Sequence, residues 1–335
     1  MFTKKIGIDL GTVNTLIFLP KRGIVLNEPS VVAISKKEKK VLAIGVQARK
    51  MLGKAPQEIT VIKPLLNGVI ADYKAAQAML TYFINKTSSF LRLFRPEIMV
   101  TVPVGITSAE RRAISEAVLK AGAKNVYLLK DPVASAIGAG IKITSAVGNM
   151  VVDIGGGTSD AAVISLGGIV SCACVRTGGA KIDQSILDYV KKRHNLAIGE
   201  TTAEKIKINL GSALFLEKDK FKKIKGRDLV SGLPRSAKIY SSEITHVIQE
   251  DLGEIIKIIK QVLQETPPEL ISDIMDRGII LTGGGAGLRN LDILISQTIG
   301  IPCYTAEDSL FCAAKGLGQA LDSLETYKQN ISTIK

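Results

Sequence analysis

Short apolar runs alternate along the chain with longer segments in which apolar residues recur every three or four positions. The short runs are typical of strands, and the longer segments are typical of amphipathic helices. The longest helical stripe runs from Ile244 to Leu263 and stops before Pro267 and Pro268, which cannot continue a helix. The pattern predicts an α/β protein without a low-complexity linker.

The same pattern places the individual elements. Besides two hairpins described below, we expect strands over residues 30–34, 41–44, 98–102, 126–129 and 278–282. We expect helices over residues 75–86, 109–121, 133–139, 182–193, 202–210 and 312–321, with a further helix from about Leu288. Thr107 or Ser108 is expected to cap the helix at 109–121, and Thr201 or Thr202 the helix at 202–210. Residues 211–240 are irregular and basic, and we expect them to carry strands.

A glycine-rich turn joins two apolar strands in the middle of the chain. Asp153 ends the first strand, residues 155–157 are all glycine, and Asp160 follows the turn. Successive glycines leave backbone N–H groups open to an anion. Carboxylates beside a phosphate are chemically reasonable if Mg²⁺ lies between them, because Mg²⁺ prefers carboxylates, waters and phosphate oxygens. The alternative is a tight turn whose acidic side chains face solvent.

A second copy of this pattern lies near the N-terminus. Residues 6–18 form an apolar strand that ends in Asp9, an aliphatic residue, Gly11, a polar turn and a second apolar strand. An internal repeat predicts two similar halves that face each other. Two such hairpins could clamp one polyphosphate between them.

Length and cysteine usage limit the class of protein. A chain of 335 residues is long enough for one large domain or two with a buried core. The four cysteines contain no CxxC pair, and Cys172 and Cys174 lie on one face of an expected strand, so we expect reduced thiols in a cytoplasm. No signal peptide precedes Ile6, and no apolar run is long enough to cross a membrane.

The formal net charge of +13 predicts an anionic partner, either nucleic acid or the inner face of a membrane. Aromatic residues make up only 4% of the chain and tryptophan is absent, so the stacking platforms of single-strand binders are lacking and no nucleic acid is expected. Lysines gather at residues 36–40 and 218–225, beside turn-like sequence. Each run is equally consistent with a solvated loop.

Several motifs in order resemble those of a known superfamily. The two hairpins, the strand and glycine turn at residues 279–285 and the helix at 312–321 resemble the motifs of the actin-type ATPases. Further stretches, at residues 67–72, 108–113, 136–140, 149–158, 226–230 and 276–278, resemble the bacterial actin family MreB over nearly the whole chain. The resemblance implies an actin-like (ribonuclease H-like, duplicated) two-lobed fold with a nucleotide in the central cleft.

The resemblance also implies a division into lobes and a role for particular residues. Residues 1–143 and 315–335 would form the first lobe, with a small subdomain at about 32–66. Residues 144–314 would form the second lobe, with a small subdomain at about 182–250. ATP and Mg²⁺ would be the cofactors. Phosphate contacts would come from Gly11, Thr12, Asn14, Gly155, Gly156, Gly157 and Thr158. Asp9 and Asp153 would order Mg²⁺ through its waters.

Further roles follow from the same resemblance. Glu204 and Lys207 correspond to nucleoside contacts, although they could also form an ordinary surface pair. The adenosine turn would comprise Gly283, Gly284 and Gly285. Asp131, Asp153 and Thr158 would be the catalytic residues.

The chain departs from the family pattern at three places. Lys130, Asp131 and Pro132 replace the usual Glu-Glu-Pro, whose second Glu positions the attacking water, so we expect a slow ATPase. Ala180 and Lys181 replace an acidic pair, and the N-terminal amphipathic helix of some members is missing. The composition and the altered catalytic segment are similar to the MreB paralogues of wall-less spiroplasmas.

These resemblances lead to a functional expectation. We expect a cytoplasmic filament protein at the inner face of the cell membrane that governs cell shape. Its partners would be copies of itself in single or paired protofilaments, paralogous filament proteins and an anionic membrane. The membrane residues would be Phe90, Leu91, Leu93 and Phe94, which resemble an insertion loop but could also pack beneath the small subdomain. The alternative is a monomeric ATP-dependent chaperone or kinase of the same fold. A chaperone would need a substrate domain, and a kinase an acceptor pocket and a base; the sequence offers neither.

Overall fold

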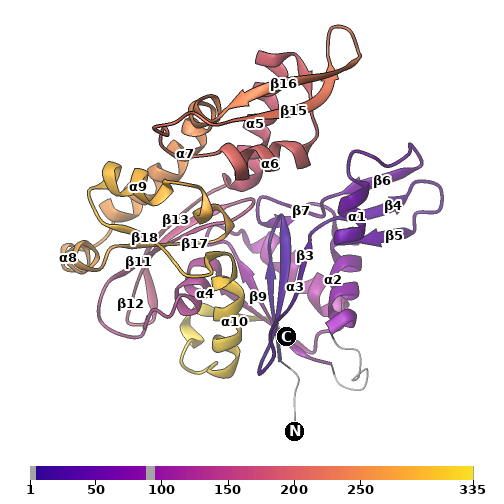
Figure 1. The fold of residues 1–335 in the computed structure, drawn as a ribbon. Coiled ribbons are helices and arrows are strands. Elements are labelled where there is room, and N and C mark those ends of the chain that lie inside the picture. Colours follow the sequence, from indigo (N-terminus) through magenta and orange to yellow (C-terminus); the bar gives the residue numbers. More distant parts are fainter. Residues whose placement is uncertain (1–4, 88–94, 335) are drawn as a thin grey trace.

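The computed structural model describes residues 5–87 and 95–334, and its two largest sheets share one arrangement (Figure 1). The first sheet has the order β3-β2-β1-β9-β10-β19, and the second has the order β13-β12-β11-β17-β18. In each sheet, three antiparallel strands are followed by two further strands that pair in parallel. In the first sheet, β19 adds an antiparallel edge. The internal repeat expected from the sequence is therefore present in the topology.

The strands of the first sheet are β1 (Lys5–Leu10), β2 (Asn14–Leu19), β3 (Gly23–Pro29), β9 (Glu97–Val102), β10 (Asn125–Lys130) and β19 (Ile331–Ile334). The strands of the second sheet are β11 (Asn149–Ile154), β12 (Ser159–Ser165), β13 (Gly168–Val175), β17 (Ile279–Thr282) and β18 (Cys303–Thr305). The β1–β2 and β11–β12 pairs are the two glycine-containing hairpins.

Two helices join the sheets through one apolar core. These helices, α4 (Asp131–Gly138) and α10 (Cys312–Asp322), pack against each other in the lower centre of Figure 1. Their core includes Met99 from the first sheet and Val151 from the second. Burial of apolar side chains from both sheets in one cluster fixes the relative position of the two lobes.

Each lobe carries a smaller sheet, and the two smaller sheets lie in the upper part of Figure 1. One contains β4 (Val32–Ser35), β5 (Val41–Ile44) and β6 (Ile59–Ile62), beside α1 (Val46–Met51). The other contains β14 (Leu196–Ala197), β15 (Phe221–Asp228) and β16 (Pro234–Tyr240), beside α5 (Gly179–His194) and α6 (Glu200–Leu210). A short hairpin of β7 (Leu65–Leu66) and β8 (Val69–Ile70) adjoins the first lobe.

The remaining helices cover the sheets. They are α2 (Tyr73–Thr87), α3 (Ser108–Lys120), α7 (Ser241–Gln264), α8 (Pro268–Arg277) and α9 (Leu291–Ile299), with 3₁₀ turns at Gly284–Gly287, Ser309–Phe311 and Lys328–Asn330. The stripe that predicted α7 is buried along most of its length. Within the described ranges, no helix has the length and apolar character needed to cross a membrane.

Two local expectations are corrected by the structure. Helix α6 begins at Glu200 after Gly199 and has no side-chain cap, so Thr201 and Thr202 lie inside its first turn. The segment after the triple glycine is first a 3₁₀ turn, and α9 begins only at Leu291. The lysine run at 218–225 lies largely in a strand, as expected for residues 211–240, because β15 pairs with β16 from Phe221 to Arg227. The predicted cap of α3, by contrast, is present: Thr107 and Glu110 form a capping box.

Candidate functional site

A cavity of about 620 Å³ is lined by residues from both lobes. Its size lies within the range of small-molecule and cofactor sites. Every residue that the sequence assigned to nucleotide, metal or catalysis lines it: Asp9, Gly11, Thr12, Asn14, Asp131, Asp153, Gly155, Gly156, Gly157, Thr158, Glu204, Lys207, Gly283, Gly284 and Gly285. The fold therefore brings together positions that lie as far apart as 9 and 285 in the chain.

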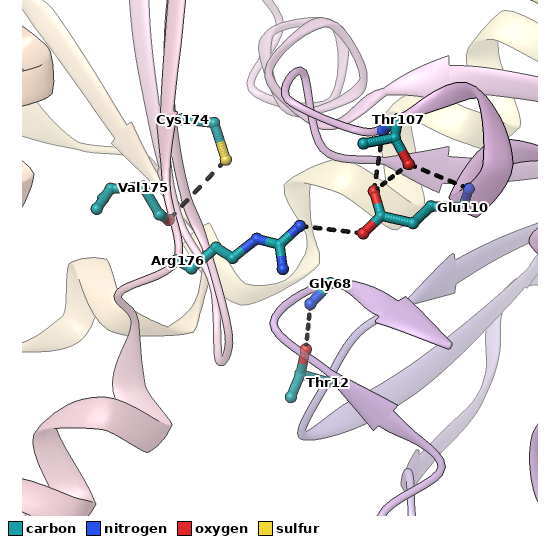
Figure 2. A network of polar contacts seen from close by, with 7 residues as sticks. All are labelled: Thr12, Gly68, Thr107, Glu110, Cys174, Val175 and Arg176. Atoms are coloured by element: carbon teal, nitrogen blue, oxygen red, sulfur yellow. Dashed lines mark hydrogen bonds and ion pairs between the residues drawn. The ribbon is translucent and has the colours of Figure 1, made fainter. Parts of the chain in front are cut away.

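The turns of the two hairpins touch each other at this cavity. A Cβ atom at Gly157 would lie 2.3 Å from the Thr12 hydroxyl oxygen, so a side chain at this position would collide with the opposite turn. The same Thr12 hydroxyl accepts a hydrogen bond of 2.9 Å from the Gly68 N–H (Figure 2). The glycines thus allow a close approach of two backbones that a larger residue would prevent.

The N-terminus of α5 supports the second turn. The N–H of Gly179 donates to the Gly155 carbonyl over 3.0 Å, and that of Ala180 donates to the Gly156 carbonyl over 2.8 Å. The first N–H groups of this helix therefore hold the turn in place, and its positive end lies beside the cavity, where Gly179 is exposed to it. This geometry favours an anion at the turn.

Two carboxylates, one from each hairpin, face the cavity. Asp9 accepts a hydrogen bond of 2.9 Å from the Thr101 hydroxyl. One carboxylate oxygen of Asp153 accepts two hydrogen bonds of 2.8 Å each, from the hydroxyls of Ser135 and Thr282. Burial and the neighbouring Asp153 raise the pKa of Asp9 to about 7. Burial also raises the pKa of Asp153.

This pair fits a divalent cation whose other ligands come from elsewhere. A cation would offset both the burial of the carboxylates and their mutual repulsion. Among the described residues, no group of three or more His, Cys, Asp or Glu side chains could hold a metal ion by itself. Mg²⁺ is a cation of this kind, because it is usually bound by one or two carboxylates together with waters and phosphate oxygens.

Asp131 is the first residue of α4 and lines the same cavity. Burial and the nearby charges of Asp160, Asp153 and Asp9 raise its pKa well above the ordinary value. Asp160 lies directly opposite Asp153 in the hairpin register but does not line the cavity. Its carboxylate instead accepts a hydrogen bond of 2.8 Å from the Val104 N–H, two residues after the end of the other lobe's β9.

The cavity contains a lysine that is held from two sides. The Lys207 ammonium donates to the Gly179 carbonyl over 2.8 Å and forms an ion pair of 2.9 Å with Asp183. Asp183 lines the cavity but was missed by the sequence analysis, as were Leu288, Arg289 and Leu310. The signal that could have found Asp183 is its place on the first turns of a helix that follows paired glycines, four residues after Gly179.

Glu204 is not an isolated surface residue. Its carboxylate forms an ion pair with Arg49 of α1, and Lys63 forms a second pair of 2.5 Å with Glu200 at the start of α6. Glu204 also lines a second cavity of about 670 Å³ together with Arg49 and Lys63. The two pairs, Arg49–Glu204 and Lys63–Glu200, therefore link the two smaller subdomains at the rim of the site; we call them the subdomain clasp.

Besides the subdomain clasp, an ion pair between Arg176 and Glu110 joins the two lobes. Figure 2 shows Arg176, which follows β13, pointing to Glu110 in the first turn of α3, at a distance of 3.0 Å. Glu110 also accepts hydrogen bonds from the N–H and hydroxyl of Thr107, over 2.9 and 2.8 Å. These hydrogen bonds, with a smaller effect of Arg176, lower the pKa of Glu110. The predicted membrane residues Phe90, Leu91, Leu93 and Phe94 lie outside the described residues.

Known proteins resemble this chain over almost its entire length. Residues 3–329 match the family model described as MreB/Mbl protein. The cell shape-determining protein Mbl of Bacillus subtilis (strain 168) is 48% identical over 97% of this chain and 98% of its own. The cell shape-determining protein MreB of Escherichia coli (strain K12) is 47% identical over 98% of this chain and 96% of its own.

A solved structure agrees with these sequence relatives. MreB5 of Spiroplasma citri, solved with ADP, superposes with a TM-score of 0.92 and 36% identity, over 98% of this chain and 99% of its own. The same protein has also been solved with AMPPNP. The two-lobed fold is thus the actin-like fold that the family resemblance implied. On the family match and these identities, the chain belongs to the MreB/Mbl family.

Proposed function

We propose that this protein binds Mg–ATP between its lobes and polymerises into filaments that govern cell shape. The observation that carries the proposal is the single cavity in which both glycine hairpins, the carboxylates and the Gly283–Gly285 turn meet. Relatives support the proposal, because Mbl and MreB are named cell shape-determining proteins and MreB5 was solved with ADP and with AMPPNP.

In this proposal the two hairpin turns bind the phosphates from opposite sides. Asp9 and Asp153 order Mg²⁺, which when bound neutralises phosphate charge. Lys207 and Glu204 lie where they can contact the nucleoside, with Lys207 positioned by Asp183. Gly283 has a φ of 81° and its Cβ would lie 2.4 Å from the Ile154 carbonyl oxygen, so only glycine allows this turn to close against β11.

Polymerisation is tested by sedimentation and negative-stain microscopy with ATP, with ADP and without nucleotide. We expect pelletable filaments with ATP, because nucleotide binding biases the subunit toward one conformation. A protein that remains monomeric under every condition would favour the monomeric chaperone or kinase alternative.

We further propose that the filaments lie at the inner face of the membrane and that Phe90, Leu91, Leu93 and Phe94 contribute to this contact. An apolar insertion together with basic residues is a common route to reversible anchoring. Leu93→Ser combined with Phe94→Ser should reduce the binding of anionic vesicles, as measured by flotation. Unchanged binding would place the contact elsewhere.

The subdomain clasp predicts an effect on nucleotide release. Arg49→Ala should speed the release of a fluorescent ATP analogue by a factor of about two to five, because a partly exposed ion pair contributes up to about 1 kcal/mol. Arg49→Lys should restore part of the effect, and high salt should reduce the difference between wild type and variant. Lys40→Ala is a matched control, since Lys40 forms an ion pair with Glu38 of the same subdomain. An unchanged release rate in Arg49→Ala would show that the clasp does not restrain the cavity.

A further inference from the structure

The hairpin of β15 and β16 presents one face entirely to solvent. In its register Phe221 lies opposite Tyr240, Lys223 opposite Lys238, Lys225 opposite Ser236 and Arg227 opposite Pro234. All eight of these side chains are exposed, whereas Ile224 and Ile239 of the other face are buried. We call these eight residues the outer face of the ribbon. In Figure 1 the ribbon forms the upper edge of the molecule.

The outer face carries four cations and no acidic residue. Lys223, Lys225 and Arg227 alternate along β15, and Lys238 comes from β16. Over residues 5–87 and 95–334, none of these four has a carboxylate within ion-pair distance; Lys238 instead lies 5.0 Å above the ring of Phe221. The inner face carries Lys222 and Arg235, of which Arg235 is paired with Asp228 over 2.8 Å. The outer face therefore has a positive charge that the protein itself does not neutralise.

One contact on this face is unfavourable by itself. Lys223 and Lys238 are directly opposite each other in the antiparallel pair, where like charges destabilise a sheet. Lysine is also a residue that blunts exposed sheet edges against aggregation, but β15 is the central strand of this small sheet. An anionic surface bound to this face would offset the repulsion between these two lysines, because both would be attracted to it.

The tip of the ribbon adds exposed apolar side chains. Val230 is 85% exposed and Leu233 is 65% exposed. Their turn is fixed by Asp228, whose carboxylate accepts hydrogen bonds from the N–H groups of Val230 and Ser231 over 3.0 and 2.8 Å. The apolar residues are therefore held outward by a preformed turn beside the basic face.

We propose that the outer face of the ribbon, with Val230 and Leu233 at its tip, binds an anionic lipid surface. The inference rests on the membrane contact proposed above and assigns it a second site. Basic residues provide attraction to anionic headgroups, and the apolar tip can enter the headgroup region. A nucleic acid would contact the cations but would leave the apolar tip without a role. The rings of Phe221 and Tyr240 lie against each other, with 5.8 Å between their centroids, and therefore pack on each other instead of offering separate platforms for bases.

The test is flotation with vesicles of equal parts phosphatidylglycerol and phosphatidylcholine, without nucleotide, so that lipid binding is separated from filament pelleting. The ribbon variant carries Lys223→Gln, Lys225→Gln, Arg227→Gln and Lys238→Gln. We expect its binding to fall by at least about tenfold, because each basic residue near such a surface adds to the attraction for anionic headgroups. Binding of wild type should fall with salt and be absent on phosphatidylcholine alone.

A matched control separates this site from net charge. Lys36→Gln, Lys37→Gln, Lys39→Gln and Lys40→Gln remove the same number of exposed charges from the turn between β4 and β5. This control should bind vesicles nearly as well as wild type. Val230→Ser with Leu233→Ser should weaken binding while leaving its salt dependence. Because all of these side chains are exposed, we expect unchanged circular dichroism. Thermal unfolding should not fall, and it should rise slightly in the ribbon variant, which loses the repulsion between Lys223 and Lys238.

Several results would overturn the inference. One is an equal loss of vesicle binding in the ribbon variant and in the control. Another is a ribbon variant that floats with vesicles as well as the wild type does. If that variant instead floats normally but no longer forms filaments with ATP, the outer face contacts a second copy of the chain. Vesicle binding that depends only on Leu93 and Phe94 would retain the proposed membrane contact and reject the ribbon. A wild type that never floats, yet polymerises, would reject both membrane sites and leave the proposed ATP-dependent filament intact.

Discussion

Asp153→Ala is expected to weaken the binding of Mg–ATP by about 10- to 100-fold, the usual effect of removing a group that orients the ligands of a metal. The binding of metal-free ATP should change little or become tighter. Without a cation, the carboxylate of Asp153 repels the phosphates, so its removal relieves an unfavourable interaction. The two measurements should therefore differ in size and can differ in sign.

The experiment compares the affinity for a fluorescent nucleotide in Mg²⁺ and in EDTA. Asp153→Asn is the informative companion, because it keeps the shape of the side chain but removes its charge. It should follow the alanine variant if charge is what matters. Ser135→Ala is the control, since it removes one hydrogen bond to Asp153 but keeps the carboxylate. Equal loss of affinity with and without Mg²⁺ would assign Asp153 a purely structural role.

Asp131→Glu is expected to speed phosphate release from ATP by up to about a hundredfold, whereas Asp131→Ala should lose little further activity. A carboxylate that positions water must reach hydrogen-bond distance, and a misplacement of about 1 Å can cost on the order of a hundredfold. The side chain of Asp131 is one methylene shorter than the glutamate that the family resemblance leads us to expect at this position. Mg–ATP binding should be similar in all three proteins, because Asp131 is not among the proposed phosphate or metal ligands.

The structure also argues against a backbone shift that would restore the reach of Asp131. The residues of α4 that follow it are buried, and Pro132 fixes the first turn. The helix packs closely on α10, where a Cβ at Gly316 would lie 1.8 Å from the Ala134 carbonyl oxygen. Close-packed helices of this kind resist a displacement of about 1 Å.

Phosphate release by wild type, Asp131→Glu and Asp131→Ala decides the matter. Asp183→Glu is a suitable control, because it lengthens another carboxylate in the same cavity by one methylene at a position that faces Lys207. It should not accelerate hydrolysis. A wild type as fast as Asp131→Glu, with Asp131→Ala much slower, would show that the shorter side chain is already a competent catalyst.

Local sequence determined those structural features that depend on residues only a few positions apart in the chain. The carboxylate-aliphatic-glycine pattern at Asp9 and Asp153 located both hairpins, because the strand alternation and the glycine turns are encoded side by side. The capping box at Thr107 likewise depends only on Glu110, three residues away. The predicted site residues could be named from such motifs, although their roles remain proposals.

Element ends were less predictable where partners lie far away in the chain. The start of α6 has hydroxyl residues that favour capping, but its first turn is fixed by Gly199 and by the pair of Glu200 with Lys63. The Glu204 side chain, predicted only as a nucleoside contact, is held by Arg49 from the other lobe. Neither pairing has a signal in the local sequence, because each joins residues more than a hundred positions apart.

The sequence by itself therefore determined the hairpin repeat, most helices and strands, and the acidic, glycine-rich character of the site. Tertiary structure alone decided which of these groups meet: Asp183 beside Lys207, and Asp131 near the carboxylates of both hairpins. It also divided the lysine run at 218–225, sending Lys223 and Lys225 outward and bringing Lys238 opposite Lys223. The physical reason is that strand register and lobe packing are set by the burial of side chains distant in sequence, and local patterns cannot specify those contacts.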